Sequence, residues 1–243
     1  MFGDLVRRSL LPPVLLCLTC LPVLGEQNPQ DPWEGFNRAM FTFNDKADAY
    51  VLRPVTKGYK AVTPDPVERG IGRMFANLGE IVSVGNSLLQ GKFRQAGHDS
   101  GRFLINSTVG VLGFFDVATE FGLYKNERED FGQTLGAWGV NSGPYLVLPF
   151  LGPSTLRDAP ARLVDGYANP INTIDHVPTR NTTYGVDVVS GRAELLDAEK
   201  LVSGDKYVFI RDVYLQRRAY LVSDGELDDD FGDFDDYDDP DDY

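Results

Sequence analysis

Residues 131–158 have the sequence FGQTLGAWGVNSGPYLVLPFLGPSTLRD, which is rich in glycine, proline and aromatic residues. They belong to a longer apolar and glycine-rich segment, 110–153, that lies between sequences of helical periodicity. By composition alone 145–148 is typical of a buried strand. Pro144 and Pro149 flank it, however, and proline is rare within central strands. We therefore expect 110–153 to have extended or turning backbone without a sheet.

Amphipathic helices are predicted on the N-terminal side of this segment. Apolar residues recur at helical spacing over 36–50, and we expect Pro54 to end that helix. The sequence Asp65-Pro66-Val67-Glu68 is typical of a helix start with Asp65 at the cap and proline in the first turn. The apolar stripe of that helix continues to Leu78, and further helices are predicted over 80–90 and 93–107.

Helices are also predicted on the C-terminal side. The sequence Thr155-Leu156-Arg157-Asp158 is typical of a capping box at a helix start. A long helix is predicted from Tyr184 to Ala198, and a last one over 206–222. In the last helix one side has Tyr207, Ile210, Tyr214 and Leu221, and the other side has three arginines, Arg211, Arg217 and Arg218. The predicted fold class is all-α with a Gly/Pro-rich irregular middle segment.

The N-terminus has the composition of a secretory signal. Arg7 and Arg8 precede an apolar run over 10–24, which is interrupted by prolines and too short for a membrane-spanning helix. We expect residues 1–25 to be a signal peptide, 26–30 a linker and 31–223 the helical domain.

Both cysteines, Cys17 and Cys20, lie in the predicted signal peptide. Cys20 is the alternative site of lipid attachment, although the residues before it match a lipoprotein cleavage site poorly. If cleavage follows Gly25, the mature chain has no thiol and therefore no disulfide and no cysteine-bound metal.

The negative charge is concentrated at the C-terminus. The 243-residue chain has a formal charge of −13, and twelve of its 36 acidic residues lie in 224–243, which leaves 24 acidic against 23 basic residues elsewhere. This tail is too charged to pack and is predicted to be disordered. Because the rest of the chain is nearly neutral, no basic surface for nucleic acid is expected.

Motifs for catalysis are missing from the sequence. It has no Gly-x-Ser-x-Gly nucleophile turn, no Gly-Lys-Ser/Thr phosphate loop and no histidine pair at i, i+4. Asp31 and Glu34 could act as a carboxylate pair, but helix N-terminal charge explains them better. We predict that the chain is not an enzyme, holds no metal and needs no cofactor.

Helical periodicity leaves one question open. An amphipathic helix buries its apolar stripe either in a protein core or in the acyl boundary of a membrane, and both produce the same spacing.

Two blocks of sequence resemble a known family. The first is DPWEGFNRAMFTFND at 31–45, which continues to Leu52-Arg53-Pro54-Val55, and the second is the stretch at 131–158. Both resemble the MlaA (VacJ) family of Gram-negative outer-membrane proteins, and the resemblance extends from Asp31 to about Glu226.

The resemblance implies a ring of amphipathic interfacial helices around a central channel, on the periplasmic face of the outer membrane. It implies that phospholipid leaves the outer leaflet through this channel and passes to a periplasmic carrier protein. The ring is expected to lie beside trimeric porins. Because ATP hydrolysis occurs elsewhere in such a pathway, no cofactor is expected.

We derive three sets of site residues as hypotheses. The channel or gating segment includes Gly132, Gly136, Gly139, Gly143, Pro144, Pro149 and Gly152. The membrane-positioning helix presents Phe36, Met40, Phe43 and Tyr50. The structural motif consists of Asp31, Pro32, Asn37, Arg157 and Asp158. The alternative function is a porin-associated structural envelope protein without lipid conduction, and a third is a periplasmic lipid hydrolase, for which the sequence offers no nucleophile with a base.

Overall fold

The computed structural model describes residues 28–196 and 204–226. The predicted signal peptide, both cysteines, Ala198 and most of the acidic tail lie outside these ranges. The helices are α1 (Glu34–Ala47), α2 (Arg53–Val62), α3 (Asp65–Leu89), α4 (Phe93–Thr108), α5 (Val117–Glu120), α6 (Phe131–Ala137), α7 (Asp158–Ala168), α8 (Val177–Leu195) and α9 (Lys206–Val222). A π-helical turn, Asp48–Leu52, joins α1 to α2, and a 3-10 turn, Pro170–Thr173, follows α7.

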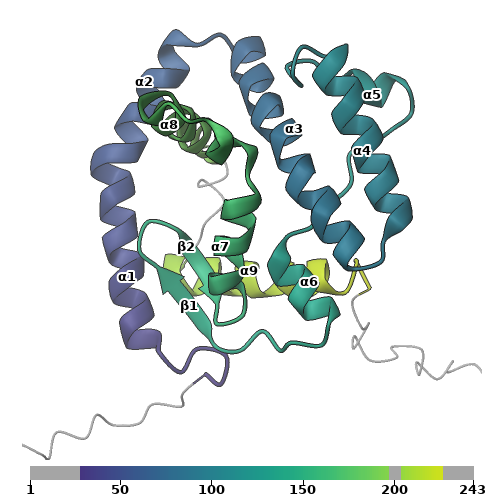
Figure 1. Cartoon of the computed structure of the whole chain (residues 1–243). Coiled ribbons are helices and arrows are strands. Elements are labelled where there is room, and N and C mark those ends of the chain that lie inside the picture. Colours follow the sequence, from purple (N-terminus) through teal and green to yellow (C-terminus); the bar gives the residue numbers. More distant parts are fainter. Residues whose placement is uncertain (1–27, 197–203, 227–243) are drawn as a thin grey trace, which may run out of the picture.

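The elements close into a ring. α1 packs against strand β1 (Tyr145–Leu148), which pairs with β2 (Gly152–Thr155), and β2 contacts α9. The packing continues from α9 through α6 and α3 to α8, and α8 contacts α2, which returns to α1 (Figure 1). The helical ring expected from the sequence is therefore confirmed.

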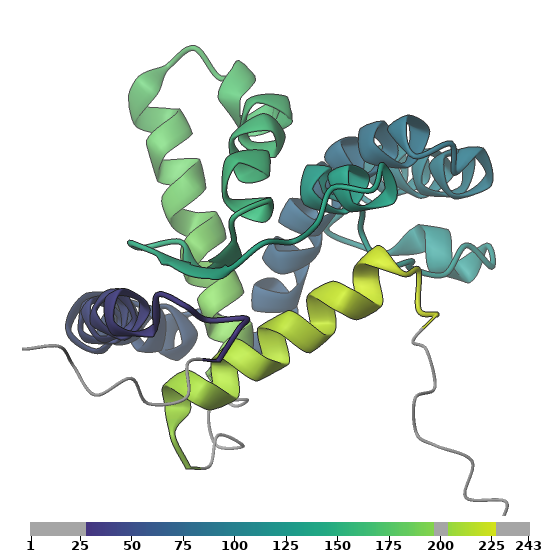
Figure 2. The same cartoon turned by 90° about the horizontal axis from the view of Figure 1, so that it is seen from below.

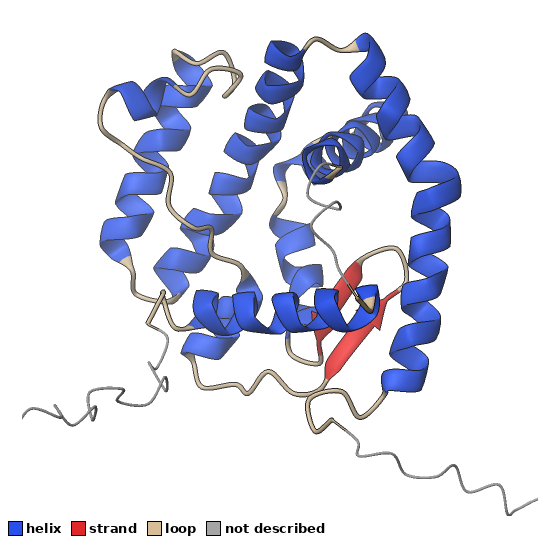
Figure 3. Ribbon diagram, turned by 180° about the vertical axis from the view of Figure 1, so that it is seen from behind, coloured by secondary structure: helices blue, strands red, loops and turns tan. Residues whose placement is uncertain are grey.

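The helices occupy different levels of the ring. Figure 2 shows α7 and α8 rising side by side from one face, and Figure 3 shows α9 crossing the opposite face in front of the hairpin. No helix in the described ranges is both long and apolar enough to cross a membrane.

The prediction of a middle segment without a sheet is wrong. β1 and β2 form an antiparallel hairpin, and residues 131–137 form α6. Pro144 and Pro149 lie just outside β1, and Pro153 is opposite Val147, whose N–H donates to Asn37 instead of β2. At this pair of residues the sheet has no hydrogen bond to which Pro153 would have to donate, so its missing N–H costs nothing. A two-stranded sheet has only edge strands, which tolerate proline.

Pro54 does not end the first helix as predicted. The Arg53 N–H donates to the Asp48 carbonyl, five residues back, and Pro54 lies in the first turn of α2. This π-helical turn changes the hydrogen-bond register just before a residue that has no N–H to donate. The helix therefore continues to Val62.

Other boundaries also shift. The helices predicted to Leu78 and over 80–90 are one helix, α3, because a single glycine at position 79 lowers helix propensity by only about 1 kcal/mol. Pro64, and not Asp65, is the N-cap of α3. α7 begins at Asp158, whose N–H donates to the Thr155 hydroxyl at 3.1 Å, so half of the predicted capping box forms.

Candidate functional site

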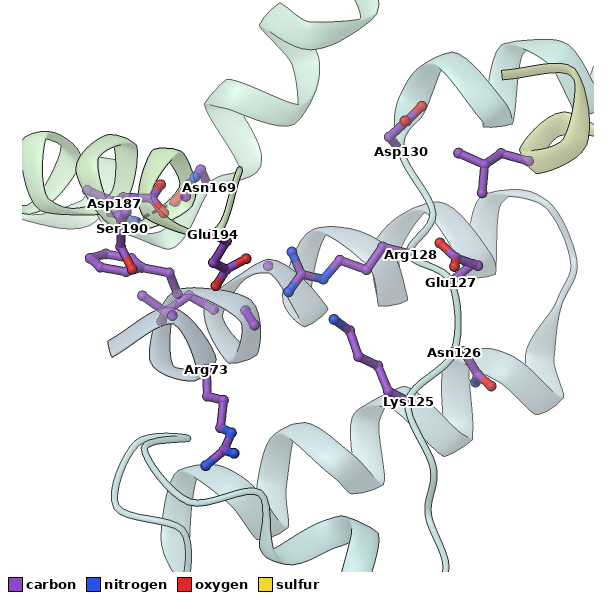
Figure 4. A pocket seen from close by; sticks show the side chains of 18 of the residues that line it. Arg73, Lys125, Asn126, Glu127, Arg128, Asp130, Asn169, Asp187, Ser190 and Glu194 are labelled. Carbon is purple, nitrogen blue, oxygen red and sulfur yellow. Dashed lines mark hydrogen bonds between the residues drawn. The ribbon is translucent and has the colours of Figure 1, made fainter. Parts of the chain in front are cut away.

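A cavity of about 830 Å³ lies inside the ring. Its walls come from α3, the segment 125–130 before α6, α8 and α9 (Figure 4). Because these elements are far apart in sequence, the cavity exists only after the ring closes. Its charged lining residues are Arg69, Arg73, Lys125, Glu127, Arg128, Asp130, Asp187, Glu194 and Arg217.

Two of the lining acids have cationic partners. Asp130 forms a two-pronged ion pair with Arg218 at 2.5 and 3.0 Å, and Glu127 lies 3.4 Å from Arg217. Within 28–196 and 204–226, the lining cations that form no ion pair are Arg69, Arg73, Lys125 and Arg128. The cavity wall thus has more unpaired cations than unpaired acids.

Arg128 lies close to acids without a hydrogen bond to them. Burial raises the pKa of Glu80, and the charge of Arg128 opposes this only in part. Burial likewise raises the pKa of Asp187, again with Arg128 as the opposing charge. The Arg128 Nε atom is itself buried without a hydrogen-bond partner among the described residues.

α3 and α4 point their polar faces inward. Asn77, Glu80, Ser83 and Asn86 of α3 are buried, whereas Val67, Ile81, Leu88 and Leu89 are exposed. In α4, Asp99, Arg102 and Asn106 are buried, whereas Phe93 and Leu104 are exposed. In a water-soluble globular protein the apolar stripe faces the core. The reversed arrangement indicates a surface that meets lipid.

Asp31 and Asn37 of the predicted structural motif come together in the structure. The Asn37 amide donates to Asp31 Oδ1 at 2.8 Å and to the Tyr145 carbonyl at 3.0 Å. The Tyr207 hydroxyl donates to Asp31 Oδ2, and burial together with this hydrogen bond raises the pKa of Tyr207. Asp31 therefore fastens α9 to the start of α1. The neighbouring Pro32 is exposed.

Arg157 and Asp158 also come together, and Arg218 of the last helix joins them. Asp158 accepts from Arg157 Nε at 2.8 Å and from Arg218 Nε at 2.9 Å. Burial alone would raise the pKa of Asp158, but the hydrogen bond from Arg157 and the charge of Arg218 hold it below its ordinary value. Arg218 is only 9% exposed and joins α9 to α6 and α7 through Asp130 and Asp158.

The glycines of the predicted channel segment have two kinds of surroundings. Gly132 and Gly136 lie in α6 where it packs closely, because a Cβ atom at Gly132 would be 2.5 Å from Asp158 Oδ1 and one at Gly136 would be 2.7 Å from Val222 Cγ1. Gly139, Gly143 and Gly152 have φ angles of +86°, +67° and +75°, which favour glycine. The cavity wall receives Asp130 and Gln133 from this region and none of these glycines. Pro144 and Pro149 border β1.

The predicted membrane-positioning residues include three exposed side chains and one that packs in the core. Phe36, Phe43 and Tyr50 follow one another at seven-residue spacing and are 52%, 43% and 81% exposed. Met40 instead packs against the core cluster of Tyr145, Val147 and Tyr207. The three aromatic residues thus form an outward stripe along α1 and the π-helical turn after it.

The cavity cations Arg73, Lys125 and Arg128 were not among the site residues predicted from the sequence. Arg69 and Arg73 are spaced i, i+4 on α3, and the small residues Gly72, Ala76 and Gly79 line the same cavity. This combination of arginines and small residues on one helix face was the available signal. Segment 125–130 has no periodicity, so its position inside the ring could not be predicted.

The fold and the site define a class of membrane-associated helical ring proteins with a charged interior and an apolar exterior. The chain belongs to the MlaA family, because the family model described as MlaA lipoprotein matches residues 29–221. The family resemblance seen in the sequence is therefore confirmed.

Curated relatives cover most of the chain. The Escherichia coli K12 protein named intermembrane phospholipid transport system lipoprotein MlaA is 36% identical over 207 residues, 83% of this chain and 82% of that protein. The protein of the same name from Haemophilus influenzae is 36% identical over 209 residues, 84% and 83% of the two chains. A solved structure from work on the structural basis for maintenance of bacterial outer membrane lipid asymmetry matches with a TM-score of 0.69 at 35% identity, covering 79% of this chain and 98% of the other.

Proposed function

We propose that this chain moves phospholipid between membranes and so maintains the lipid asymmetry of the outer membrane. The observation that carries the proposal is the reversed amphipathicity of the ring, with polar side chains and a cavity of about 830 Å³ inside and large apolar side chains outside. The relatives named as phospholipid transport lipoproteins support the same function.

The physical reason lies in the two halves of a phospholipid. Its headgroup is charged and its acyl chains are apolar, so crossing a membrane core costs the headgroup its hydration. A polar cavity in a ring embedded at the interface offers the headgroup polar partners, while the exposed apolar side chains remain in contact with acyl chains.

Export, location and partners of the chain are proposed as the sequence predicts them. Residues 1–25 direct export and are removed, which places the ring at the periplasmic face of the outer membrane. Phospholipid leaves the outer leaflet through the ring and passes to a periplasmic carrier, and the ring lies beside trimeric porins. Cys20 is the alternative anchor by acylation, and the mass of the mature N-terminus distinguishes it from cleavage after Gly25.

We further propose that the chain is not an enzyme and uses no cofactor or metal. In 28–196 and 204–226 no group of three His, Cys, Asp or Glu side chains could hold a metal ion. Incubation of the purified chain with labelled phospholipid is expected to release no fatty acid, and release would support the lipid hydrolase instead.

The experiment that tests the function measures outer-leaflet phospholipid in a strain that lacks the gene. We expect phospholipid to accumulate in the outer leaflet and the wild-type gene to reverse this. Absence of accumulation would contradict the proposal.

The alternative, a porin-associated structural protein without lipid conduction, requires a separate test. Vesicles that contain the purified chain and no porin are expected to exchange phospholipid faster than empty vesicles. If they do not, while porin assembly fails in the deletion strain, the structural role is favoured.

A further inference from the structure

Two cations of segment 125–130 meet inside the ring cavity. Figure 4 shows the Lys125 ammonium and the Arg128 guanidinium pointing into the same space, whereas the side chain of Arg73, which also lines the cavity, extends away from them. Within the described ranges none of these three side chains forms an ion pair or donates a hydrogen bond. The acid that faces Arg128 in this view is Glu194 of α8.

Arg128 packs against α3. A Cβ atom at Gly79 would be 2.9 Å from Arg128 Nη1, so the guanidinium lies directly against the α3 backbone. Its Nε is buried without a partner in the part of the chain that the structure describes. Because part of this half-buried guanidinium has lost water without gaining a partner, a ligand anion at this position would gain more than the same contact at a fully exposed arginine.

Glu194 does not neutralise the pair. Its Oε1 atom would be only 2.6 Å from a Cβ at Gly72, so its carboxylate is packed against α3. Glu80 and Asp187 also lie near Arg128, and burial raises the pKa of both carboxyl groups. Among the described residues none of the three acids forms an ion pair with Lys125 or Arg128, so the N–H groups of both cations remain free for an anion. A phosphate diester has one negative charge and two free oxygens, which fit the planar fork of a guanidinium, while lysine acts as a point charge.

We propose that Lys125 and Arg128 form a binding site for the phosphate diester of a phospholipid headgroup on its way through the ring. This inference rests on the proposed function and names the group of the lipid that the channel recognises. Glu194 weakens the site by repulsion, so that the headgroup binds and is released again.

The test measures binding of soluble probes to the full mature chain, purified in a non-ionic detergent. The probes are dihexanoyl-phosphatidylglycerol, dihexanoylglycerol (which lacks the phosphate) and inorganic phosphate, followed by titration calorimetry. For the phospholipid probe we expect the dissociation constant to rise about tenfold in Arg128→Gln, because charge-assisted hydrogen bonds are lost. Lys125→Gln, at an exposed position, is expected to weaken binding several-fold even if Arg128→Gln folds poorly.

Two further variants sharpen the test. Glu194→Gln is expected to bind the phospholipid probe more tightly than the wild type, which a purely structural role of these residues does not predict. Arg180→Gln, on α8 away from the cavity lining, is the matched control and is expected to bind as the wild type does. Equal affinity of Arg128→Gln, Lys125→Gln and Arg180→Gln for the probe would overturn the site.

The probes distinguish a lipid headgroup from free phosphate as the ligand. Together with the deletion strain they also distinguish failure of the phosphate site from failure of the proposed function. Weak binding of inorganic phosphate and of dihexanoylglycerol supports a lipid headgroup site. Equal binding of inorganic phosphate and the phospholipid probe would assign the site to free phosphate and overturn the inference. If the wild-type gene fails to restore asymmetry in the deletion strain, the proposed function fails; if it restores asymmetry and all variants bind normally, only the phosphate site fails.

Discussion

Asn37 takes the place of a neighbouring strand. Its amide donates to the Tyr145 carbonyl and accepts from the Val147 N–H at 2.9 Å, which satisfies the free edge of β1. Asn44, seven residues later on α1, repeats the arrangement with the Leu148 carbonyl at 2.9 Å and the Phe150 N–H at 2.7 Å. Backbone groups at a buried edge need such partners.

We predict that Asn37→Ala destabilises the protein by about 2–3 kcal/mol, because the buried edge of β1 loses its partner and Asp31 Oδ1 loses one hydrogen bond. Chemical unfolding followed by circular dichroism measures this change. Asn181→Ala, at an exposed position of α8, is the control and is expected to change stability little. Equal stability of both variants would show that the edge of β1 does not depend on Asn37.

Glycine at position 139 allows a test of the proposed gate. At φ +86° an alanine costs about 1–2 kcal/mol of backbone strain, although no atom lies within 4 Å of its Cβ. Gly91 has φ +76° and equally open surroundings but lies outside the segment 132–152. We predict similar stability losses for Gly139→Ala and Gly91→Ala, but slower phospholipid transfer only for Gly139→Ala. Equal transfer rates would contradict the gating role.

At the scale of elements, α9 connects the ring across its lower face. Arg211 and Arg218 are 7% and 9% exposed and reach Asp31, Asp130 and Asp158 from one helix. These ion pairs hold α9 against the rest of the ring. Because they are buried, removing one partner would leave an uncompensated charge.

The buried ion pairs of α9 predict a particular pH dependence. Because the pKa of Asp158 is lowered in the folded state, its contribution to stability is present above the unfolded value of about 3.9 and is lost as the pH falls through the lower folded value. We predict that Asp158→Asn is less stable than the wild type at pH 7 and that the difference narrows below about pH 4. Melting temperatures from pH 7 to 3 measure this, with Asp175→Asn, at an exposed position, as the control. A difference that does not change with pH would contradict the assignment.

The exposed aromatic stripe along α1 and the π-helical turn after it leads to a prediction about membrane binding. Phe36→Glu and Phe43→Glu together are expected to weaken binding of the mature chain to phospholipid vesicles by about tenfold or more, because each phenylalanine contributes about 1.5–3 kcal/mol when it enters the acyl boundary. Vesicle flotation measures the bound fraction. Lys57→Glu, exposed on α2, tests the effect of charge alone. Unchanged flotation of the double variant would remove the stripe from the membrane contact.

At the scale of the whole molecule, the cavity depends on closure of the ring. Gly191 of α8 lines it, and a Cβ at this position would meet no atom within 4 Å. Gly85 of α3 has equally open surroundings and does not line the cavity. A bulky side chain can therefore be introduced inside or outside the ring with similar local strain.

We predict that Gly191→Trp slows phospholipid transfer several-fold in reconstituted vesicles, because the indole occupies the path, whereas Gly85→Trp does not. Similar melting temperatures of the two variants would confirm that folding is intact. Equal transfer by both would mean that phospholipid does not pass through this cavity.

The sequence by itself determined the helical class and the family, because periodicity, caps and two long motifs depend only on neighbouring residues. Asp31, Asn37, Arg157 and Asp158 could be assigned to a structural motif from sequence, since they belong to those two blocks, but their hydrogen-bond partners could not. The π-helical turn before Pro54 and the hairpin at 145–155 were not predictable. Their hydrogen bonds depend on a changed register and on Asn37, which is 108 residues from Tyr145 in the chain.

Only the tertiary structure decided which face of each helix is inside. An apolar stripe that packs in a core and one that meets lipid have the same spacing, so α3 and α4 could not be oriented from sequence. Ring closure turned Glu80, Asp99 and Arg102 inward and left Phe93 and Leu104 outside. It also brought Lys125 and Arg128, from a segment without periodicity, into one cavity with Glu194, because α8 returns to α3 only when the ring is complete.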